Sequence, residues 1–207
     1  MQKISLVWLK RDLRLSDHAP LAEAIRSGLP VLLIYCFEPS LISAPQSDLR
    51  HWRFVWESLQ DLQDRLHPHS AQVAIFYREA EEVFSFLADK FAIQTVFSHQ
   101  ETGIDLTFKR DLRVADFFRR KGIQWKEYLQ QGVERGRKNR NRWNNLWFGF
   151  MSASLAQPDW DRASWVKLDE KNWDEFPQNP IPEAWKVPNP QMQPGGESKG
   201  RKYLQSF

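Results

Sequence analysis

Short apolar runs alternate with segments of helical periodicity over residues 1–131, and this alternation constrains the fold more than any other feature. Five runs are dominated by apolar side chains, the last of them weakly: 4–9, 31–37, 73–77, 95–98 and 123–128. Strands covered by helices on both faces read as near-continuous apolar runs. The pattern predicts an α/β fold, a five-stranded parallel doubly wound sheet of Rossmann or flavodoxin type with helices on both faces.

Four segments between these runs have the spacing of amphipathic helices. The clearest is 48–66, where large apolar residues recur at steps of three and four from Trp52 to Leu66. The others are 17–27, 80–91 and 106–121. Gly28 and Gly122 follow the first and the last of them, and glycine is the residue that most often ends a helix.

The chain changes character after residue 131. Seven of its twelve prolines fall beyond this point, and proline removes a backbone donor, so we expect an irregular linker over 132–194. A short helix is expected within 142–156. Four tryptophans of the linker are expected to pack on another surface: Trp160, Trp165, Trp173 and Trp185. Gly195 and Gly196 precede a last helical pattern, which we interpret as the start of a truncated second domain, 195–207, with no surface in this chain to pack on.

Composition narrows the classes of function. No run of about 18 apolar residues is present, and the amino terminus has no signal cleavage site, so we expect a cytoplasmic protein without a membrane partner. Cys36 is the only cysteine and the histidines are scattered, which excludes an internal disulfide and predicts no metal site. The net charge of +3 and the pI near 9.0 permit contact with nucleic acid without requiring it.

Polar residues at the strand ends are the candidate site residues, because ligands of an open parallel sheet bind outside the carboxyl ends of its strands. These positions hold Lys10, Arg11, Asp12, Glu38, Arg78, His99, Gln100 and Glu101. A purely structural role remains an alternative for each of them. The sequence KRDLRLSD after the first strand has no glycine for close approach to a pyrophosphate, so a standard NAD enzyme is not expected. No P-loop or G-x-S-x-G turn occurs, and we assign no catalytic residue.

Basic residues cluster between 135 and 142, followed by Trp143 and Trp147. Arginine beside aromatic rings suits phosphates and stacked bases, which makes Arg137, Lys138 and Arg140 candidates for nucleic-acid binding. The alternative is a solvated loop, or a face paired with acidic residues of another domain.

The segment LVWLKRDLRLSDHAPL at 6–21 closely resembles the opening of cryptochrome/photolyase proteins, which read W-x-R-x-D-L-R-x-x-D-N followed by an apolar residue. His18 stands where the family usually has Asn. Further segments support the resemblance: Arg53-Phe54, 57–59, 99–103, 109–112, and Gly195-Gly196-Glu197, which is similar to the G-G-E that opens the helical domain of the family.

This resemblance implies that 1–131 is the amino-terminal antenna domain of a DNA photolyase-like flavoprotein. Such a domain holds methenyltetrahydrofolate, a deazaflavin or a flavin such as FMN, and passes excitation energy to FAD in a carboxyl-terminal helical domain that this chain lacks. The resemblance makes Glu101 a carboxylate for a pterin or flavin ring, with Gln100, Arg11 and Asp105 as further cofactor-binding candidates.

The whole protein is then expected to be a lyase that repairs damaged DNA in blue light, with the FAD domain and the damaged DNA as its partners. The present chain alone is expected to be non-catalytic. One alternative is a fragment of a cryptochrome-type blue-light receptor without repair activity. Another is a free-standing nucleotide-binding protein with the same type of sheet.

Overall fold

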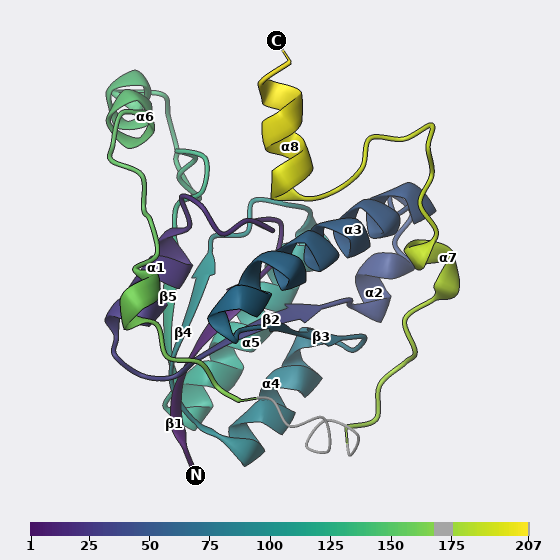
Figure 1. Ribbon diagram of the computed structural model, residues 1–207. Helices are drawn as coiled ribbons and strands as arrows, with labels where there is room; N and C mark the ends of the chain where they lie inside the picture. The colour runs from purple at the N-terminus through teal and green to yellow at the C-terminus, as the bar shows by residue number, and fades with distance from the viewer. Residues whose placement is uncertain (168–175, 207) are drawn as a thin grey trace.

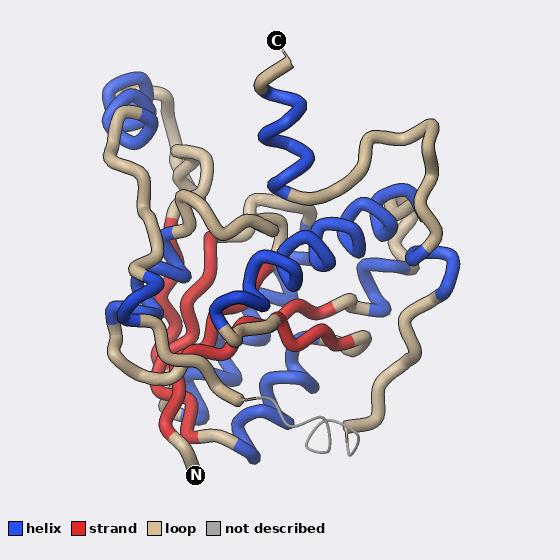
Figure 2. The backbone as a smooth tube through the Cα atoms, viewed as in Figure 1, coloured by secondary structure: helices blue, strands red, loops and turns tan. Residues whose placement is uncertain are grey.

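A five-stranded parallel sheet forms the centre of the molecule, in the strand order β3–β2–β1–β4–β5 (Figures 1 and 2). The computed structural model describes residues 1–167 and 176–206. The strands are β1 (Lys3–Leu9), β2 (Val31–Cys36), β3 (Val73–Phe76), β4 (Ala92–His99) and β5 (Gln124–Tyr128). The predicted sheet is confirmed, although β4 begins at Ala92, ahead of the apolar run at 95–98.

Helices cover both faces of this sheet, as predicted. On one face, α4 (Ala80–Lys90) and α5 (Asp105–Lys121) pack on inward-facing residues of the strands such as Leu6 and Trp8. On the other, α1 (Ala19–Arg26) and α3 (Leu49–Leu66) pack on residues such as Val7 and Leu33. Successive residues of a strand point to opposite faces, so each strand contributes to both halves of the core.

Capping residues define the ends of several helices. The Asp48 carboxylate accepts a hydrogen bond from the Arg50 N–H at 2.9 Å and caps α3. His18 caps α1 in the same way, because its Nδ1 accepts from the Leu21 N–H at 3.1 Å. At the other end of α5, Gly122 adopts a φ of +68°, a left-handed conformation that glycine reaches without strain.

The segment after β5 returns over the sheet domain and buries some of its tryptophans. Trp185, in the short helix α7 (Glu183–Lys186), is 4% exposed and packs against Phe37, Trp52 and Tyr77. Trp165 bridges to Val31. Two short helical turns line this path, η1 (His67–His69) and η2 (Trp160–Arg162), where Trp160 stacks on His69. The expected packing is therefore confirmed for three tryptophans, and Trp173 lies outside the described residues.

Of two further short helices, one is expected from the sequence and the other is not. The helix expected within 142–156 is α6 (Trp143–Met151), and all nine of its residues are at least partly exposed. It projects beyond the end of the sheet where the strands finish (Figure 1). The four-residue helix α2 (Pro39–Ile42), directly after β2, is absent from the sequence expectation, because four residues are too few to show periodicity.

The last helix, α8 (Glu197–Leu204), does have a surface to dock on, which corrects the sequence expectation. Its first turn lies on α3: the backbone N–H groups of Gly195, Gly196 and Ser198 donate to the side chains of Glu57, Ser58 and Asp61 at 2.7, 2.9 and 3.1 Å. These contacts satisfy donors that a helix start leaves unpaired.

Glu197 completes this junction by accepting hydrogen bonds from the Leu15 N–H at 2.8 Å and from Arg65. Burial alone would raise the pKa of Glu197, but hydrogen bonds from Ser16, Arg65 and Leu15 outweigh burial and lower the pKa to about 2. Glu197 is therefore ionised throughout the neutral range, and α8 is tied to the loop after β1. None of the helices in the described ranges has the length and apolar character needed to cross a membrane.

Gly196, at the start of α8, can be tested by substitution. It has a φ of +106°, and an added Cβ would lie 2.7 Å from the Asp61 Cβ. We expect Gly196→Ala to weaken the docking of α8 by about 1–3 kcal/mol through backbone strain and this clash, which accelerates amide hydrogen exchange in 197–204. Gly200→Ala is the matched control, because an added Cβ meets nothing within 4 Å there and alanine stabilises a helix interior by about 1 kcal/mol. Equal exchange in the two variants would contradict this role of Gly196.

Candidate functional site

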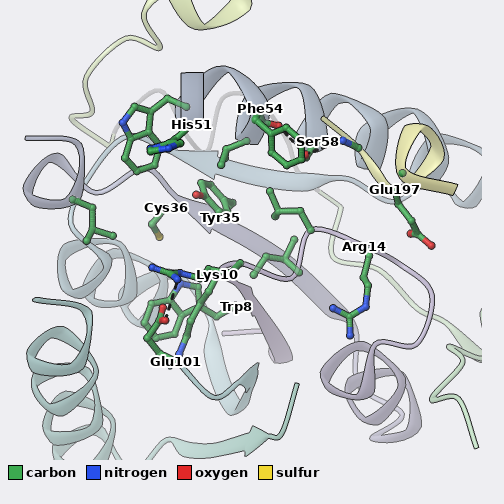
Figure 3. Close-up of a pocket in the computed structure, with 18 of the residues that line it drawn as sticks. Trp8, Lys10, Arg14, Tyr35, Cys36, His51, Phe54, Ser58, Glu101 and Glu197 are labelled. Atoms are coloured by element: carbon green, nitrogen blue, oxygen red, sulfur yellow. Dashed lines mark hydrogen bonds and ion pairs between the residues drawn. The ribbon is translucent and has the colours of Figure 1, made fainter. Parts of the chain in front are cut away.

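A cavity of about 880 Å³ opens at the carboxyl edge of the sheet, between the ends of β1 and β2 and the side of α3. Figure 3 shows His51, Phe54 and Ser58 of α3 along one side, Lys10 and Glu101 on the opposite side, and Tyr35 and Cys36 between them. Residues of α8, including Glu197 and Arg201, also line the cavity. The position matches the general rule for ligand sites in open parallel sheets.

Arg110 of α5 forms the polar centre of this site. Its Nη2 donates to Asp111 Oδ1 at 2.8 Å and lies 3.4 Å from Glu101 Oε2, and its Nη1 donates to Glu38 Oε1. The guanidinium also lies over the Trp8 ring, with Cζ 4.8 Å from the ring centroid. Burial alone would lower the pKa of Arg110, but the neighbouring carboxylates of Glu38 and Asp111 raise it, so the cation is permanent.

Lys10 is a second buried cation beside it. Its Nζ donates to Asp111 Oδ2 at 3.0 Å and lies 4.3 Å from the centroid of the Trp8 ring and 5.1 Å from that of Trp125. Burial is the main cause that lowers the pKa of Lys10, and Asp111 opposes it. Both cations therefore pair with Asp111 and lie over the same indole ring, which fixes the second turn of α5 to the end of β1.

Two carboxylates of the cavity each keep one oxygen without a hydrogen-bond partner among the described residues. Glu38 is 2% exposed, and its Oε2 is not hydrogen-bonded. Glu101 Oε1 has Arg11 Nε at 3.6 Å, beyond hydrogen-bond distance. Burial raises the pKa of Glu38 to about 7, because the desolvation of its carboxylate outweighs the attraction of Arg110. Both oxygens are enclosed in the wall of the cavity, although buried polar atoms are nearly always paired.

Asp12 and two histidines form a separate buried cluster under the loop after β1. Asp12 Oδ2 lies 2.9 Å from His18 Nε2 and 2.5 Å from His99 Nδ1, while Asp12 Oδ1 accepts from the Lys10 N–H at 2.7 Å. Burial would raise the pKa of Asp12, but the hydrogen bonds to both histidines hold it well below its usual range. Burial lowers the pKa of His99 despite the neighbouring carboxylate.

The same three residues have the ligand types of a metal site, but their hydrogen bonds fit a different role. His18 Nδ1 accepts the cap hydrogen bond of α1, so the ring proton is on Nε2, which lies 2.9 Å from Asp12 Oδ2. A metal ligand at Nε2 would need the opposite tautomer. The cluster is therefore a carboxylate that orients two imidazoles and ties the loop after β1 to α1 and β4.

The predicted cofactor residues are only partly brought together. Glu101 is buried at the wall of the main cavity, and Arg11 lies beside it with a largely exposed side chain. Gln100 lines a smaller polar pocket of about 210 Å³ next to it, together with Arg11, Glu101 and His99. Asp105 is exposed, pairs with Lys109 at 2.6 Å and lines neither pocket.

Glu38 and Arg110 line the cavity, although the sequence alone identifies neither as a cofactor-binding residue. In the sequence, Glu38 is one of several polar strand ends, and Arg110 is one of several charged residues in the helical segment 106–121. No sequence signal connects them, because they are 72 positions apart.

The predicted nucleic-acid residues differ in what they contact. Arg137 donates to Glu134 at 2.6 Å and to the Asn139 carbonyl oxygen at 2.7 Å, so it organises its own loop. Lys138 and Arg140 are exposed and form no ion pair within the part of the chain that the structure describes.

The contribution of Asp12 to the free energy of unfolding should depend on pH. Replacing Asp12 by Asn leaves both imidazoles without their anionic partner, and we expect the free energy of unfolding at pH 7 to fall by about 3 kcal/mol. Because the folded-state pKa of Asp12 is depressed, its contribution is present above its unfolded pKa of about 3.9 and is lost as the pH falls through the folded value.

Urea unfolding of Asp12→Asn and of the unmodified chain at pH 7 and at about pH 3.5 measures the difference between their free energies of unfolding. This difference should be smaller at the lower pH. Asp89→Asn is the control, since Asp89 is exposed and lies 4.0 Å from Lys121. A difference between Asp12→Asn and the unmodified chain that does not change with pH would refute the assignment.

Comparison with known proteins agrees with this architecture. The chain matches the DNA photolyase family over residues 5–133. It is 31% identical over 113 residues to a cryptochrome DASH of Synechocystis and 34% identical over 119 residues to one of Gloeobacter violaceus. These matches cover 52% and 55% of this chain but 23% and 24% of the relatives, so the chain spans well under two thirds of their length.

Solved structures share the fold over nearly the whole chain. A Synechocystis cryptochrome superposes with a TM-score of 0.74 at 20% identity, covering 99% of this chain and 46% of its own. An archaeal photolyase from Sulfolobus tokodaii, solved with two FAD molecules, gives a TM-score of 0.72 at 20% identity and covers 97% of this chain and 45% of its own. Since the family match spans more than half of the chain and includes residues of all five strands, the chain belongs to the cryptochrome/photolyase family, as the resemblance of residues 6–21 implied.

Proposed function

We propose that this chain is the light-harvesting domain of a photolyase-like flavoprotein and that the cavity at the carboxyl edge of the sheet holds its antenna chromophore. The cavity itself carries the proposal: about 880 Å³ lies within the range of roughly 300–1,000 Å³ in which proteins bind compounds of this size. Its walls combine apolar side chains with a few buried polar groups, the usual composition of such sites.

The residues present fit a flat heteroaromatic group. Phe54 and Val55 of α3, with Tyr35 of β2, provide apolar surface for the faces of a ring. Glu38 and Glu101 place two carboxylates in the wall of the cavity. A bound chromophore would supply absorption of near-ultraviolet or blue light and transfer of the excitation energy.

The protein itself would hold the chromophore in a fixed position. Arg110 holds the two carboxylates from one side, and α3 with α8 limits the access of water from the other. Energy transfer depends on the distance and orientation of the chromophore relative to the acceptor, so a rigid wall made of helices and strand ends suits this role better than loops. The Sulfolobus tokodaii photolyase with two FAD molecules is described as implicating a novel light-harvesting cofactor, which supports a flavin as one candidate for this cavity.

For the whole protein, we propose blue-light-driven repair of damaged DNA, with FAD held by a carboxyl-terminal helical domain. The family match supports this reading. The alternative of a receptor without repair activity gains no support from any described residue of this chain. The present chain contributes the antenna, and the chemistry of bond cleavage belongs to the proposed FAD domain.

A binding experiment tests the antenna proposal. We expect the purified chain to bind at least one of FMN, an 8-hydroxy-deazaflavin and methenyltetrahydrofolate, seen as a shift in the absorption band and quenching of its fluorescence. Val55→Trp fills the cavity and should weaken this binding by tenfold or more, about 1.4 kcal/mol or above. Val133→Trp is the control, because Val133 is exposed and does not line the cavity.

Retained binding in Val55→Trp would place the chromophore elsewhere, and no binding of any of the three compounds to the unmodified chain would defeat the proposal. Thermal unfolding of each variant separates loss of the site from loss of the fold.

We also propose that the basic segment contributes to contact with DNA. Lys138 and Arg140 are the cations available for phosphate, while Arg137 is engaged within its loop. Replacing Lys138 and Arg140 with Ala should lower the slope of log Kd against log salt by about 2, since each cation that binds a phosphate contributes about one unit to the slope.

The control replaces Lys3 and Arg120, two exposed cations distant in sequence from this segment. Filter binding of a short duplex at several salt concentrations measures the slope. An unchanged slope in the Lys138 and Arg140 variant would mean that the segment only supports the fold.

A further inference from the structure

The helix α8, with the glycine that precedes it, forms one wall of the cavity. This wall is made by five residues that line the cavity: Gly196, Glu197, Gly200, Arg201 and Leu204. We propose that α8 is a gate: a ligand occupies the cavity only while α8 is docked on α3, and Glu197 is the positioning residue that holds α8 there. This inference rests on the proposed function of the cavity and adds how access to the cavity is controlled.

The contacts that dock α8 belong to the wall of the cavity itself. On one side, the Gly196 N–H donates to Ser58 Oγ of α3 at 2.9 Å. On the other, Arg201 Nη2 donates to Ser16 Oγ in the loop after β1 at 2.5 Å. Ser58 and Ser16 both line the cavity. Undocking of α8 therefore opens the cavity along this side.

Glu197 lies where these two sides meet. Its carboxylate accepts hydrogen bonds from the Leu15 N–H at 2.8 Å and from Arg65 of α3. Arg201, one turn further along α8, donates to the same carboxylate at 2.9 Å. Figure 3 shows Glu197 at the end of the cavity opposite His51. A single side chain thus ties α8 both to α3 and to the loop after β1.

The rest of α8 adds little to this docking. Residues 199–206 are all exposed, and α8 has no buried residue. Beyond its first turn, the helix projects away from the sheet (Figure 1). Segments with few buried contacts open locally at a lower free energy than unfolding of the whole domain requires. We therefore expect α8 to undock while the sheet and its other helices stay folded.

Docking of α8 and binding of a ligand are linked through these contacts. A ligand shifts an equilibrium between two states only by its difference in affinity for them. The undocked state lacks the wall that α8 provides, so it binds the ligand more weakly. When only the docked state binds, a ligand suppresses undocking in proportion to its concentration, by about 100-fold at roughly 100 times its Kd.

Amide hydrogen exchange in the unmodified chain tests this linkage. Exchange of 197–204 is measured without ligand and with increasing concentrations of FMN, the 8-hydroxy-deazaflavin and methenyltetrahydrofolate, each added separately. For a compound that binds, we expect exchange in 197–204 to slow by about 100-fold at roughly 100 times its Kd. The helix α6 is the internal control, because none of its residues 143–151 lines the cavity and its exchange should not change.

Two variants weaken the docking from opposite sides of one ion pair. Glu197→Gln keeps the size of the side chain and removes its charge, so exchange of 197–204 without ligand should accelerate about tenfold. The dissociation rate of a bound chromophore, followed by stopped-flow fluorescence, should rise by the same factor, because release requires undocking. Arg65→Gln breaks the same contact from α3 and should have the same effects. Glu183→Gln is the control, since Glu183 is exposed, does not line the cavity and pairs with Lys186 in α7 at 2.7 Å.

Unchanged exchange in 197–204 with a bound chromophore would overturn the gate and leave the cavity as a chromophore site. The same conclusion follows if exchange accelerates in Glu197→Gln and Arg65→Gln but dissociation of the chromophore does not. Absence of binding by all three compounds to the unmodified chain would overturn the proposed function and this inference together. If neither variant folds, the exchange experiment on the unmodified chain still decides the question.

Discussion

A buried guanidinium holds the carboxyl edge of this sheet together. Arg110 lies over the indole of Trp8 and binds three carboxylates from different parts of the chain: Glu38 after β2, Glu101 after β4 and Asp111 beside it in α5. Removing a charge of this kind from water is costly unless its donors are satisfied, so the surrounding strand ends must keep their places. The walls of the cavity are therefore fixed by the same contacts that stabilise this edge of the sheet.

The fold can be predicted from the sequence because its signals are local. The apolar run at 31–37 and the helical spacing at 48–66 each identify an element without reference to the rest of the chain. Parallel strand pairing then follows, since the segments between the strands are long enough to contain crossover helices. The observed start of β4 differs from the predicted one, because the first residues of β4 pair with β1 although their sequence is mixed.

The site can be predicted only in part, because its contacts are long-range. Glu101 is expected from the resemblance and does line the cavity. Asp105 is on the exposed side of α5 and does not line the cavity. The pairing of Glu38 with Arg110 joins residues 72 positions apart, and no periodicity or spacing encodes such a contact. The docking of α8 on α3 escapes sequence analysis for the same reason, since its hydrogen bonds span 137 and 138 positions.

The balance of charge in the buried network explains why Glu38 is the residue whose protonation changes. Four cations are in or beside it, Lys10, Arg11, Arg110 and Arg135, together with four carboxylates, Glu38, Glu101, Asp111 and Glu127. In a region of low dielectric, the carboxylate with the weakest compensation is the one whose pKa rises. Glu38 has a single cationic partner and is almost fully buried, so burial raises its pKa to about 7.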